Sequence, residues 1–396
     1  MTTDAQGLGA GDSKLRDPRI RAIIYQILVI VLFIAFVYYV GSNTADNLQK
    51  LGISSGLGFL KQPSGFGIGI VLIMDYSSQT STHFDVLLIG IINTLAVSIS
   101  GIFLATTLGF IFGVLRLSRN WVVNKIAAVY IEVVRNIPLL VQLLFWYFAV
   151  LGVLPLVKES FQLGENFYVN NRGINFPSIV PSEGFWVIPV ALLVAIVIGV
   201  FISKWAKKRQ DLTGETFPVF LSFVVLIIVL PTIAAFIMGL PYTIDYPKFG
   251  RFGIGGGWVL EPEFLALLIG LSVYTGAFIA EIVRSGINSV SHGQTEAANS
   301  LGIRSGLAMR LVVLPQALRV IVPPLTSQYL NLVKNSSLAT AIGYADITAI
   351  FAGTSLNQTG QAIEVIGITM LFYLSISLII SMFMNWYNKR IALVER

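Results

Sequence analysis

The sequence lacks several residue types on which soluble enzymes and metal sites depend. None of its 396 residues is cysteine, which excludes disulfide bonds and thiolate metal sites. The two histidines, His83 and His292, are too few and too far apart in the chain for a histidine metal cluster. Charged residues make up only 12% of the chain, whereas soluble domains carry roughly 25%. So few charges cannot cover a water-soluble fold of this size, and we predict that the chain lies in a membrane.

Catalytic and nucleotide-binding motifs are also missing. No Gly-Lys dipeptide occurs, so the chain has no P-loop and is not expected to bind ATP in the usual way. We therefore predict a protein that is not an enzyme, that binds no cofactor or metal, and whose energy comes from a partner. The formal net charge of +6 does not require nucleic acid as a partner, because it is explained by the charges that orient a chain in a membrane.

Long uncharged runs dominate what is present, and 55% of the residues are apolar. About 20 such residues cross the hydrocarbon core as a helix. The first run is expected to be a retained anchor, since no small-residue cleavage site follows it. The runs predict an all-α, polytopic membrane protein with about eight transmembrane helices, at about 22–41, 86–115, 136–157, 184–203, 217–240, 263–284, 332–353 and 363–388.

Lysine and arginine are distributed unevenly over the loops between these helices. With the N-terminus in the cytoplasm, 19 of them fall in cytoplasmic segments, 6 in periplasmic segments, and Lys334 lies within a span. Every loop then follows the positive-inside rule, so both termini are expected in the cytoplasm. The outer segments 41–85 and 158–183 are rich in Gly, Ser, Asn and Pro, and we expect ordered but irregular loops there.

The inner loop 284–319 carries the most distinctive pattern. Ser291 followed by Gln294 is typical of a capping box at a helix start, and Gly302 suits the left-handed residue just past a helix end. A second short helix is predicted from about Ser305 to Val313, stopped near Pro315. Two short helices at the inner membrane face would form a projecting knob that a partner protein could bind. The alternative is an ordinary amphipathic loop lying on the membrane.

This loop resembles the EAA loop of binding-protein-dependent ABC importer permeases. That pattern is Glu-Ala-Ala, three residues, Gly, nine residues, and then Ile-x-Leu-Pro, which the sequence matches with Val in place of Ile. The matching residues are Glu296, Ala297, Ala298, Gly302, Val312, Leu314 and Pro315. Further segments resemble the polar amino acid branch of that family, namely Asn93-Thr94-Leu95, Arg135 to Gln142, Ala280 to Arg284 and Lys334 to Leu338. The resemblance covers about 86–157 and 262–390.

The resemblance implies a type I ABC importer permease core with additions. Residues 1–85 would hold the cytoplasmic N-terminus, the anchor helix and a periplasmic loop, and 86–392 the permease core. The core would contain the coupling loop at 285–319 and an insertion, 158–261, that brings two extra spans. This eight-span form resembles a permease of the general L-amino acid uptake systems of proteobacteria, so a multi-pass location in the bacterial inner membrane is implied.

The implied function is ATP-driven import of L-amino acids. Its partners would be two ATP-binding cassette subunits, which hold the ATP, a second homologous permease in a heterodimer, a periplasmic amino-acid-binding protein and membrane lipid. The alternative is a secondary transporter driven by an ion gradient. That class normally shows inverted repeats or intramembrane carboxylates, and no duplication is visible between 86–240 and 241–396. A membrane scaffold is a third possibility, but it leaves the EAA pattern unexplained.

Two sets of residues are candidates for functional roles. The ATPase-coupling set, carried over from the EAA motif, is Glu296, Ala297, Ala298, Gly302, Leu314 and Pro315. The substrate-path set consists of polar residues within or at the ends of predicted spans, because such groups usually face a cavity or the bundle interior. Its members are Gln142, Asn335, Ser336, Ser337 and Glu364. Ordinary interhelical hydrogen bonds are the alternative for this second set, and Lys334 has the alternative of extending to the inner surface.

Overall fold

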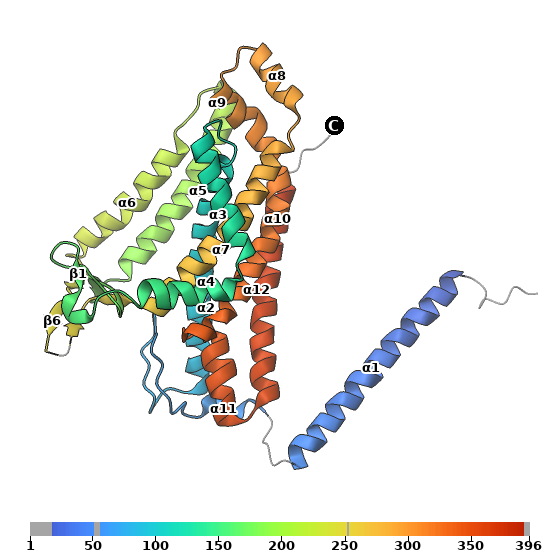
Figure 1. Cartoon of the computed structure of the whole chain (residues 1–396), viewed down its shortest axis with the longest axis vertical. Coiled ribbons are helices and arrows are strands. Elements are labelled where there is room, and N and C mark those ends of the chain that lie inside the picture. The colour runs from blue at the N-terminus through green and yellow to red at the C-terminus, as the bar shows by residue number, and fades with distance from the viewer. Residues whose placement is uncertain (1–17, 51–55, 252, 392–396) are drawn as a thin grey trace, which may run out of the picture.

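The computed structural model describes residues 18–50, 56–251 and 253–391, which form a bundle of long helices (Figure 1). Within these ranges, seven helices are long and apolar enough to span a membrane. They are Arg21–Thr44, His83–Leu115, Val187–Thr213, Val219–Ile237, Pro262–Asn288, Ser305–Ile342 and Ala362–Ile391. A bent helix pair could provide an eighth span. The predicted helical membrane architecture is confirmed, with corrections at the third and seventh predicted spans.

The centre of the bundle is the contact between α2 (His83–Leu115) and α7 (Pro262–Asn288). Small residues on α2 let the two backbones approach closely. A Cβ atom added at Gly109 would lie 2.3 Å from the Ile279 side chain, so only glycine fits at that position. The small residues Gly109 and Gly113 of α2 therefore pack against α7 within this chain.

The third predicted span, 136–157, is wrong in its bounds. Helix α3 (Trp121–Asn136) ends there, and a second helix runs through α4 (Leu139–Leu144) and the π-helical segment η3 (Phe145–Leu151). The two helices are bent by 108° relative to each other. The cause is Pro138, which disfavours helical backbone at the preceding residue, and Ile137 is extended at φ −102°.

The seventh predicted span, 332–353, is also wrong in its bounds. One continuous helical stretch runs through α9 (Ser305–Ala308), η5 (Met309–Val313), α10 (Leu314–Asn335) and η6 (Ser336–Ile342). Pro315 does not stop it, because the wider π-helical turns of η5 directly precede the proline and relieve its clash with the preceding turn. After a break, the chain continues as η7 (Ile347–Ser355), α11 (Leu356–Thr359) and α12 (Ala362–Ile391).

The predicted insertion, 158–261, contains β-structure, including within 158–183, where an irregular loop was expected. Its helices α5 (Val187–Thr213) and α6 (Val219–Ile237) pack on each other as a hairpin. The flanking segments pair with one another, in an antiparallel sheet of order β1-β2-β3-β8 and two strand pairs, β4-β5 and β6-β7. The strands are β1 (Phe161–Gln162), β2 (Tyr168–Asn170), β3 (Gly173–Phe176), β4 (Ser178–Pro181), β5 (Tyr242–Asp245), β6 (Lys248–Gly250), β7 (Gly253–Gly255) and β8 (Trp258–Leu260). Pairing across the hairpin makes these segments one unit.

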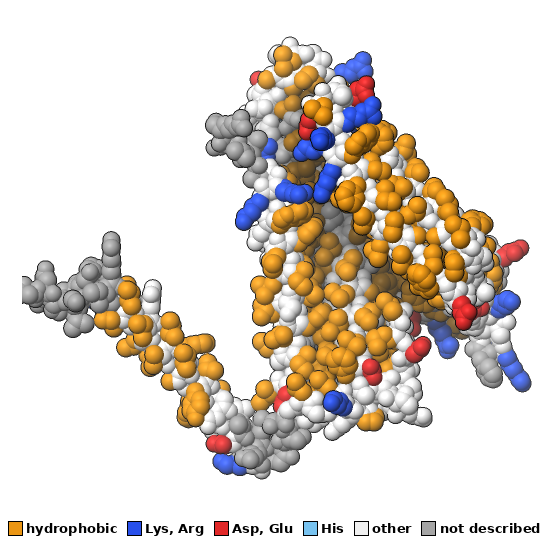
Figure 2. All heavy atoms as spheres, turned by 180° about the vertical axis from the view of Figure 1, so that it is seen from behind, with side chains coloured by type: hydrophobic (Ala, Val, Ile, Leu, Met, Phe, Trp, Pro, Cys, Tyr) orange, Lys and Arg blue, Asp and Glu red, His pale blue; other side chains and the backbone are white. Residues whose placement is uncertain are grey.

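The remaining elements lie at the two ends of the bundle. A short helix, α8 (His292–Ser300), projects at the end that also holds the C-terminal end of α12, while α11 lies at the opposite end (Figure 1). Helix α1 (Pro18–Lys50) lies apart from the bundle, and none of its most apolar window is buried. Figure 2 shows Lys and Arg side chains gathered near the α8 end and apolar side chains along the helices, as a membrane protein requires.

Candidate functional site

Helix α8 is a surface knob, as the sequence predicts for the coupling loop. Glu296, Ala297 and Gly302 are exposed, and Leu301 at its end is 80% exposed. Ala298 is buried, at 4% exposure, and attaches the helix to the rest of the protein. Within the described residues, the Glu296 carboxylate makes no hydrogen bond, so it is available to a partner.

The ends of α8 agree with the prediction at Gly302 but not at Ser291. Gly302 has φ +71°, and the following Ile303 N–H donates to the Ala298 carbonyl at 3.1 Å, which closes the helix as a left-handed glycine does. The predicted capping box is wrong, because the Ser291 side chain makes no capping hydrogen bond. The Gln294 side chain instead accepts a hydrogen bond from Gln316 Nε2 at 3.2 Å, which ties α8 to α10.

Leu314 and Pro315 lie on the long helix rather than in the knob. Leu314 is half-buried and Pro315 is exposed, both at the start of α10. The continuous helical stretch Ser305–Ile342 has 38 residues, although about 20 suffice to cross a bilayer. It therefore joins the α8 knob directly to the middle of the bundle.

The structure brings Asn335, Ser336 and Ser337 together where α10 meets η6. The Ser336 hydroxyl is fully buried and donates to the Val333 carbonyl at 2.7 Å. The Ser337 hydroxyl donates to the Lys334 carbonyl at 2.8 Å. Asn335 is half-buried, and its side chain makes no hydrogen bond within the described residues. Asn335 is therefore the member of this group with donors and an acceptor still free.

An exposed polar face on the same helix was missed from the sequence. Ser327, Asn331, Lys334 and Thr340 are all exposed and recur at spacings of three to six residues along α10 and η6. Polar side chains on a spanning helix are costly against lipid and usually face a water-filled cavity or another helix. Their spacing could have revealed this face, because it repeats close to the helical period.

Two of the predicted path residues serve local structure. Gln142 is buried, and its Nε2 donates to the Val134 carbonyl at 2.8 Å and the Ile137 carbonyl at 2.9 Å. These carbonyls lose helical partners at the bend after α3, so Gln142 fixes the bend. Glu364, in the first turn of α12, accepts a hydrogen bond from the Gly56 N–H at 2.7 Å and holds a loop at the end opposite α8.

The break between η6 and η7 contains a buried carboxyl that the sequence reasoning did not single out. Gly343 has φ +80°, and the chain then runs without helix to Asp346, whose side chain is fully buried. Asp346 Oδ1 accepts a hydrogen bond from the Ala349 N–H at 2.8 Å, at the start of η7. Asp346 lies within the predicted span 332–353, so it could have been noticed as an intramembrane carboxyl.

Side chains of α2 hold this break in place. Asn93 Nδ2 donates to the Ala345 carbonyl at 2.8 Å and the Ile70 carbonyl at 2.9 Å, while the Tyr344 hydroxyl donates to the Asn93 carbonyl at 2.9 Å. The Thr94 hydroxyl accepts from the Ile347 N–H at 3.1 Å. Non-helical backbone at membrane depth requires such partners. The Asn93-Thr94 pair, noted in the sequence for its resemblance, thus supports the broken helix.

Two acceptors at the break remain without donors. Asn93 Oδ1 and Asp346 Oδ2 are buried and accept no hydrogen bond from the described residues. Broken spanning helices with polar groups at the break are a recurrent way to build a substrate or ion site in transporters. The arrangement of an exposed helical knob, a continuous helix and a polar break is that of a membrane transport permease.

The chain belongs to the family of binding-protein-dependent transport system inner membrane components, whose family model matches residues 195–393. It is therefore the permease component of an ATP-driven importer, and the alternative of a transporter driven by an ion gradient is set aside. The family consists of transport permeases and is not enzymatic. Membership implies an ATPase and a binding protein as partners.

Curated relatives match over nearly the whole chain. The general L-amino acid transport system permease protein AapQ of Rhizobium johnstonii is 50% identical over 396 residues, covering 100% of this chain and 98% of the relative. The putative amino-acid ABC transporter permease protein YhdX of Escherichia coli is 48% identical, covering 98% of each. A solved amino acid ABC transporter with histidines is 21% identical, with a TM-score of 0.45, over 78% of this chain and 95% of that chain.

Proposed function

We propose that this chain is one of two permease subunits that form the path for L-amino acids through a bacterial inner membrane. The relatives named for general L-amino acid transport and for amino-acid ABC transport support this substrate class. A third relative, the glutamate/glutamine/aspartate/asparagine transport system permease protein BztB of Rhodobacter capsulatus, is 43% identical and covers 96% of this chain and of the relative. The binding protein would deliver the substrate from the periplasm.

The exposed polar face formed by Ser327, Asn331, Lys334 and Thr340 is the observation that carries the proposal. Within the described residues nothing covers this face. The Thr340 hydroxyl donates to the Ser337 carbonyl at 3.1 Å, but against lipid the side chains of Ser327, Asn331 and Lys334 would lack hydrogen-bonding partners. A second, homologous permease placed against it would enclose a polar path between the two subunits. Asn335 and Ser337 lie on the border of the same face and would line that path.

The long helix Ser305–Ile342 is proposed to couple this path to ATP. Glu296, Ala297, Ala298 and Gly302 would sit in a cleft of one cassette subunit, with Leu314 and Pro315 at the start of the helix that leads inward. Two cassette subunits would bind the ATP, and this chain would bind no cofactor. Closing of the cassettes would shift α8 and so favour one of two arrangements of the bundle, which is a bias on an existing equilibrium.

The orientation follows from charge. Lys and Arg side chains gather near the α8 end (Figure 2). A cytoplasmic position for that end agrees with the loop count, in which 19 of the 26 Lys and Arg residues fall in cytoplasmic segments when both termini lie in the cytoplasm. The insertion and its strands would then face the periplasm. Substrate would enter from the strand end and leave beside α8.

Uptake by the complete reconstituted importer tests the proposal. Vesicles should take up amino acid only with ATP on the cassette side and binding protein on the other, with no need for an ion gradient. Glu296→Lys and Gly302→Asp should leave assembly intact but uncouple ATP hydrolysis from uptake. The control Glu165→Lys reverses an exposed carboxylate in the insertion, far along the chain from α8, and should have no effect. Wild-type uptake by both α8 variants would remove the coupling role.

A further inference from the structure

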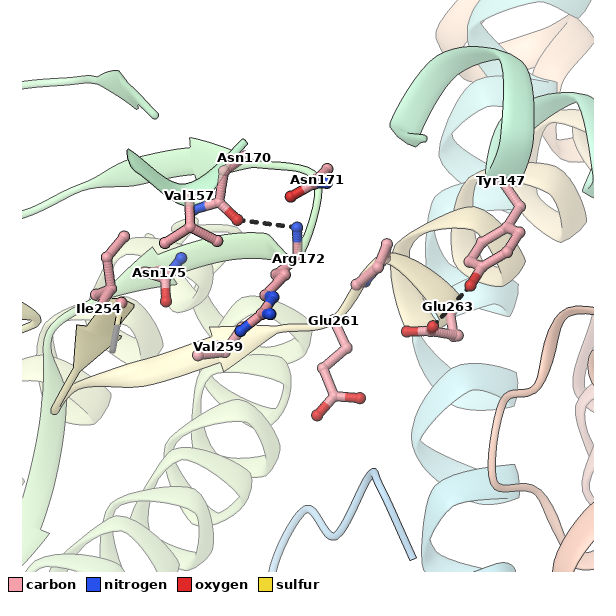
Figure 3. A pocket seen from close by; sticks show the side chains of 12 residues that line it. Tyr147, Val157, Asn170, Asn171, Arg172, Asn175, Ile254, Val259, Glu261 and Glu263 are labelled. Atoms are coloured by element: carbon pink, nitrogen blue, oxygen red, sulfur yellow. Dashed lines mark hydrogen bonds between the residues drawn. The ribbon is translucent and has the colours of Figure 1, made fainter. Parts of the chain in front are cut away.

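A pocket of about 410 Å³ lies between the insertion and the permease core, at the end opposite α8 (Figure 3). One wall comes from the β2–β3 turn and strand β8 of the insertion. The other comes from Glu261 and Glu263 at the start of α7, and from Tyr147 of η3. Small-molecule sites typically enclose about 300–1,000 Å³, so the pocket is large enough for an amino acid.

The pocket contains charges of both signs. Arg172 extends into it between Asn175 and Glu261, with Glu263 beyond (Figure 3). No ion pair to Arg172 within 4.0 Å occurs among the described residues, so its guanidinium is available to an anion. The Glu263 carboxylate accepts a hydrogen bond from the Tyr147 hydroxyl at 2.9 Å, which fixes its position. A guanidinium and two carboxylates therefore share one cavity without neutralising one another directly.

Polar groups without partners line the insertion side of the same cavity. Asn175 is 4% exposed, and its side chain makes no hydrogen bond within the described residues. Asn171 Oδ1 is buried without a donor. A buried polar atom without a partner, such as Asn171 Oδ1, is costly unless a ligand or water satisfies it. These side chains thus indicate a site built for a polar ligand.

The β2–β3 turn that carries Arg172 is held rigidly. Asn170 is 1% exposed, its Oδ1 accepts a hydrogen bond from the Arg172 N–H at 2.9 Å, and its Nδ2 donates to Ser160 Oγ at 3.0 Å. Strand β3 also pairs with β8, which leads directly into Glu261 and α7. The sheet therefore sets the position of the arginine relative to the two carboxylates.

We propose that this pocket binds the α-ammonium and α-carboxylate groups of a free amino acid, as a holding site between the binding protein and the membrane path. Arg172 binds the carboxylate, Glu261 and Glu263 bind the ammonium, and Asn175 supplies further hydrogen bonds. The inference rests on the proposed function for its substrate class, but it assigns a separate site to the insertion.

The start of α7 also packs against the broken helix. Phe264 of α7 lies with its ring centroid 5.9 Å from that of Tyr344, the residue hydrogen-bonded to Asn93 at the broken helix. The helix that begins after Glu261 therefore packs directly against the segment that contains Asp346.

Equilibrium binding to the assembled importer tests this site. The complex of permeases and cassettes, in lipid nanodiscs without binding protein or ATP, is titrated with radiolabelled L-glutamine. Because the pocket recognises groups common to all α-amino acids, L-glutamine should bind whatever the transport selectivity. Glutaramate, which lacks the ammonium, and 4-aminobutanamide, which lacks the α-carboxylate, should each compete at least about tenfold more weakly, the equivalent of 1.4 kcal/mol.

Variants then place the binding. Arg172→Gln and Glu261→Gln should each raise the dissociation constant about tenfold or more, and Arg172→Lys should restore part of the loss. Lys248→Gln is the matched control, since it removes an exposed cation from strand β6 of the same insertion outside the pocket. Normal assembly with the partner subunits is checked for each variant by size-exclusion chromatography.

Three outcomes would overturn the holding site. The first is absence of L-glutamine binding, and the second is unchanged binding in both pocket variants. The third is loss of all binding in Asn335→Leu, which would assign the bound glutamine to the membrane path. ATP-dependent uptake by the wild-type complex is measured in parallel, so failure of the holding site is distinguishable from failure of the proposed function.

Discussion

Replacing Asn93 by leucine removes the side chain that joins α2 to the broken helix and to the loop before α2. Asn93 is fully buried, and its Nδ2 donates to the carbonyls of Ala345 and Ile70. Leucine is close to asparagine in size, so the change removes hydrogen bonds without opening a large cavity. Both carbonyls lose this donor in the interior of the protein, where neither water nor detergent can replace it.

The magnitude follows from these two carbonyls. A buried group left without its partner costs about 1–3 kcal/mol, whereas hydrogen bonds between helices in membrane proteins average about 0.6 kcal/mol because the unfolded chain also finds partners. Leucine also removes the unpaired Asn93 Oδ1, which offsets part of this loss, so we expect the free energy of unfolding to fall by about 1–3 kcal/mol. The break Gly343–Asp346 should loosen first, since the Ala345 carbonyl, which loses the Asn93 donor, lies within it.

Equilibrium unfolding in mixed micelles, titrated with sodium dodecyl sulfate, measures this loss. The matched control is Asn136→Leu, because the Asn136 side chain is exposed and bonds only to the Glu132 carbonyl of its own helix. The control should change the free energy of unfolding by no more than about 0.5 kcal/mol. If Asn93→Leu proved equally neutral, the view that Asn93 supports the broken helix would be wrong.

Three further predictions concern the path, pH dependence and orientation. Asn335→Leu should raise the half-saturation concentration for uptake about tenfold to a hundredfold, while the control Ser285→Ala leaves it unchanged. If assembled complexes with Asn335→Leu and with the wild-type chain had the same half-saturation concentration, the site would lie in the partner permease. Burial and a neighbouring carboxylate raise the pKa of Glu261 to about 7, so lowering the pH from 8 to 6 should protonate this carboxylate. The ammonium of glutamine then loses a partner, and glutamine binding to the wild type should weaken. The same pH dependence in Glu261→Gln would refute the assignment to Glu261. A cysteine at Lys207 should react with impermeant maleimide only from the cytoplasm, and one at Leu163 only from the periplasm; the reverse labelling would invert the topology.

The sequence was a reliable guide wherever one property of a segment decides its structure. Six of the eight predicted spans coincide with long apolar helices, because length and hydropathy alone determine whether a helix can cross a bilayer. The knob at α8 was also predicted, since Glu-Ala-Ala favours helix and Gly302 ends it by its own backbone preference. These features depend on neighbours within a few residues.

The two wrong spans show where local rules stop. Pro138 was expected within the start of a span, yet it bends the chain by 108°, and Gln142 from the next helix satisfies the carbonyls that the bend leaves open. Pro315 was expected to end a helix, yet the preceding π-helical turns accommodate it. In both cases the neighbouring backbone and side chains decide whether proline bends, ends or continues the helix, and the presence of proline alone does not.

The sequence by itself determined that this protein spans a membrane and how its charges are distributed over the loops, and it predicted the exposed helix α8. Only the tertiary structure decided which polar residues act together. Asn93 and Asp346 are 253 residues apart, and Arg172 and Glu261 are separated by the whole α5–α6 hairpin, so no local pattern joins them. Their proximity depends on long-range packing of α2 against η7 and pairing of β3 with β8, which bring distant polar groups to one place inside an apolar surrounding.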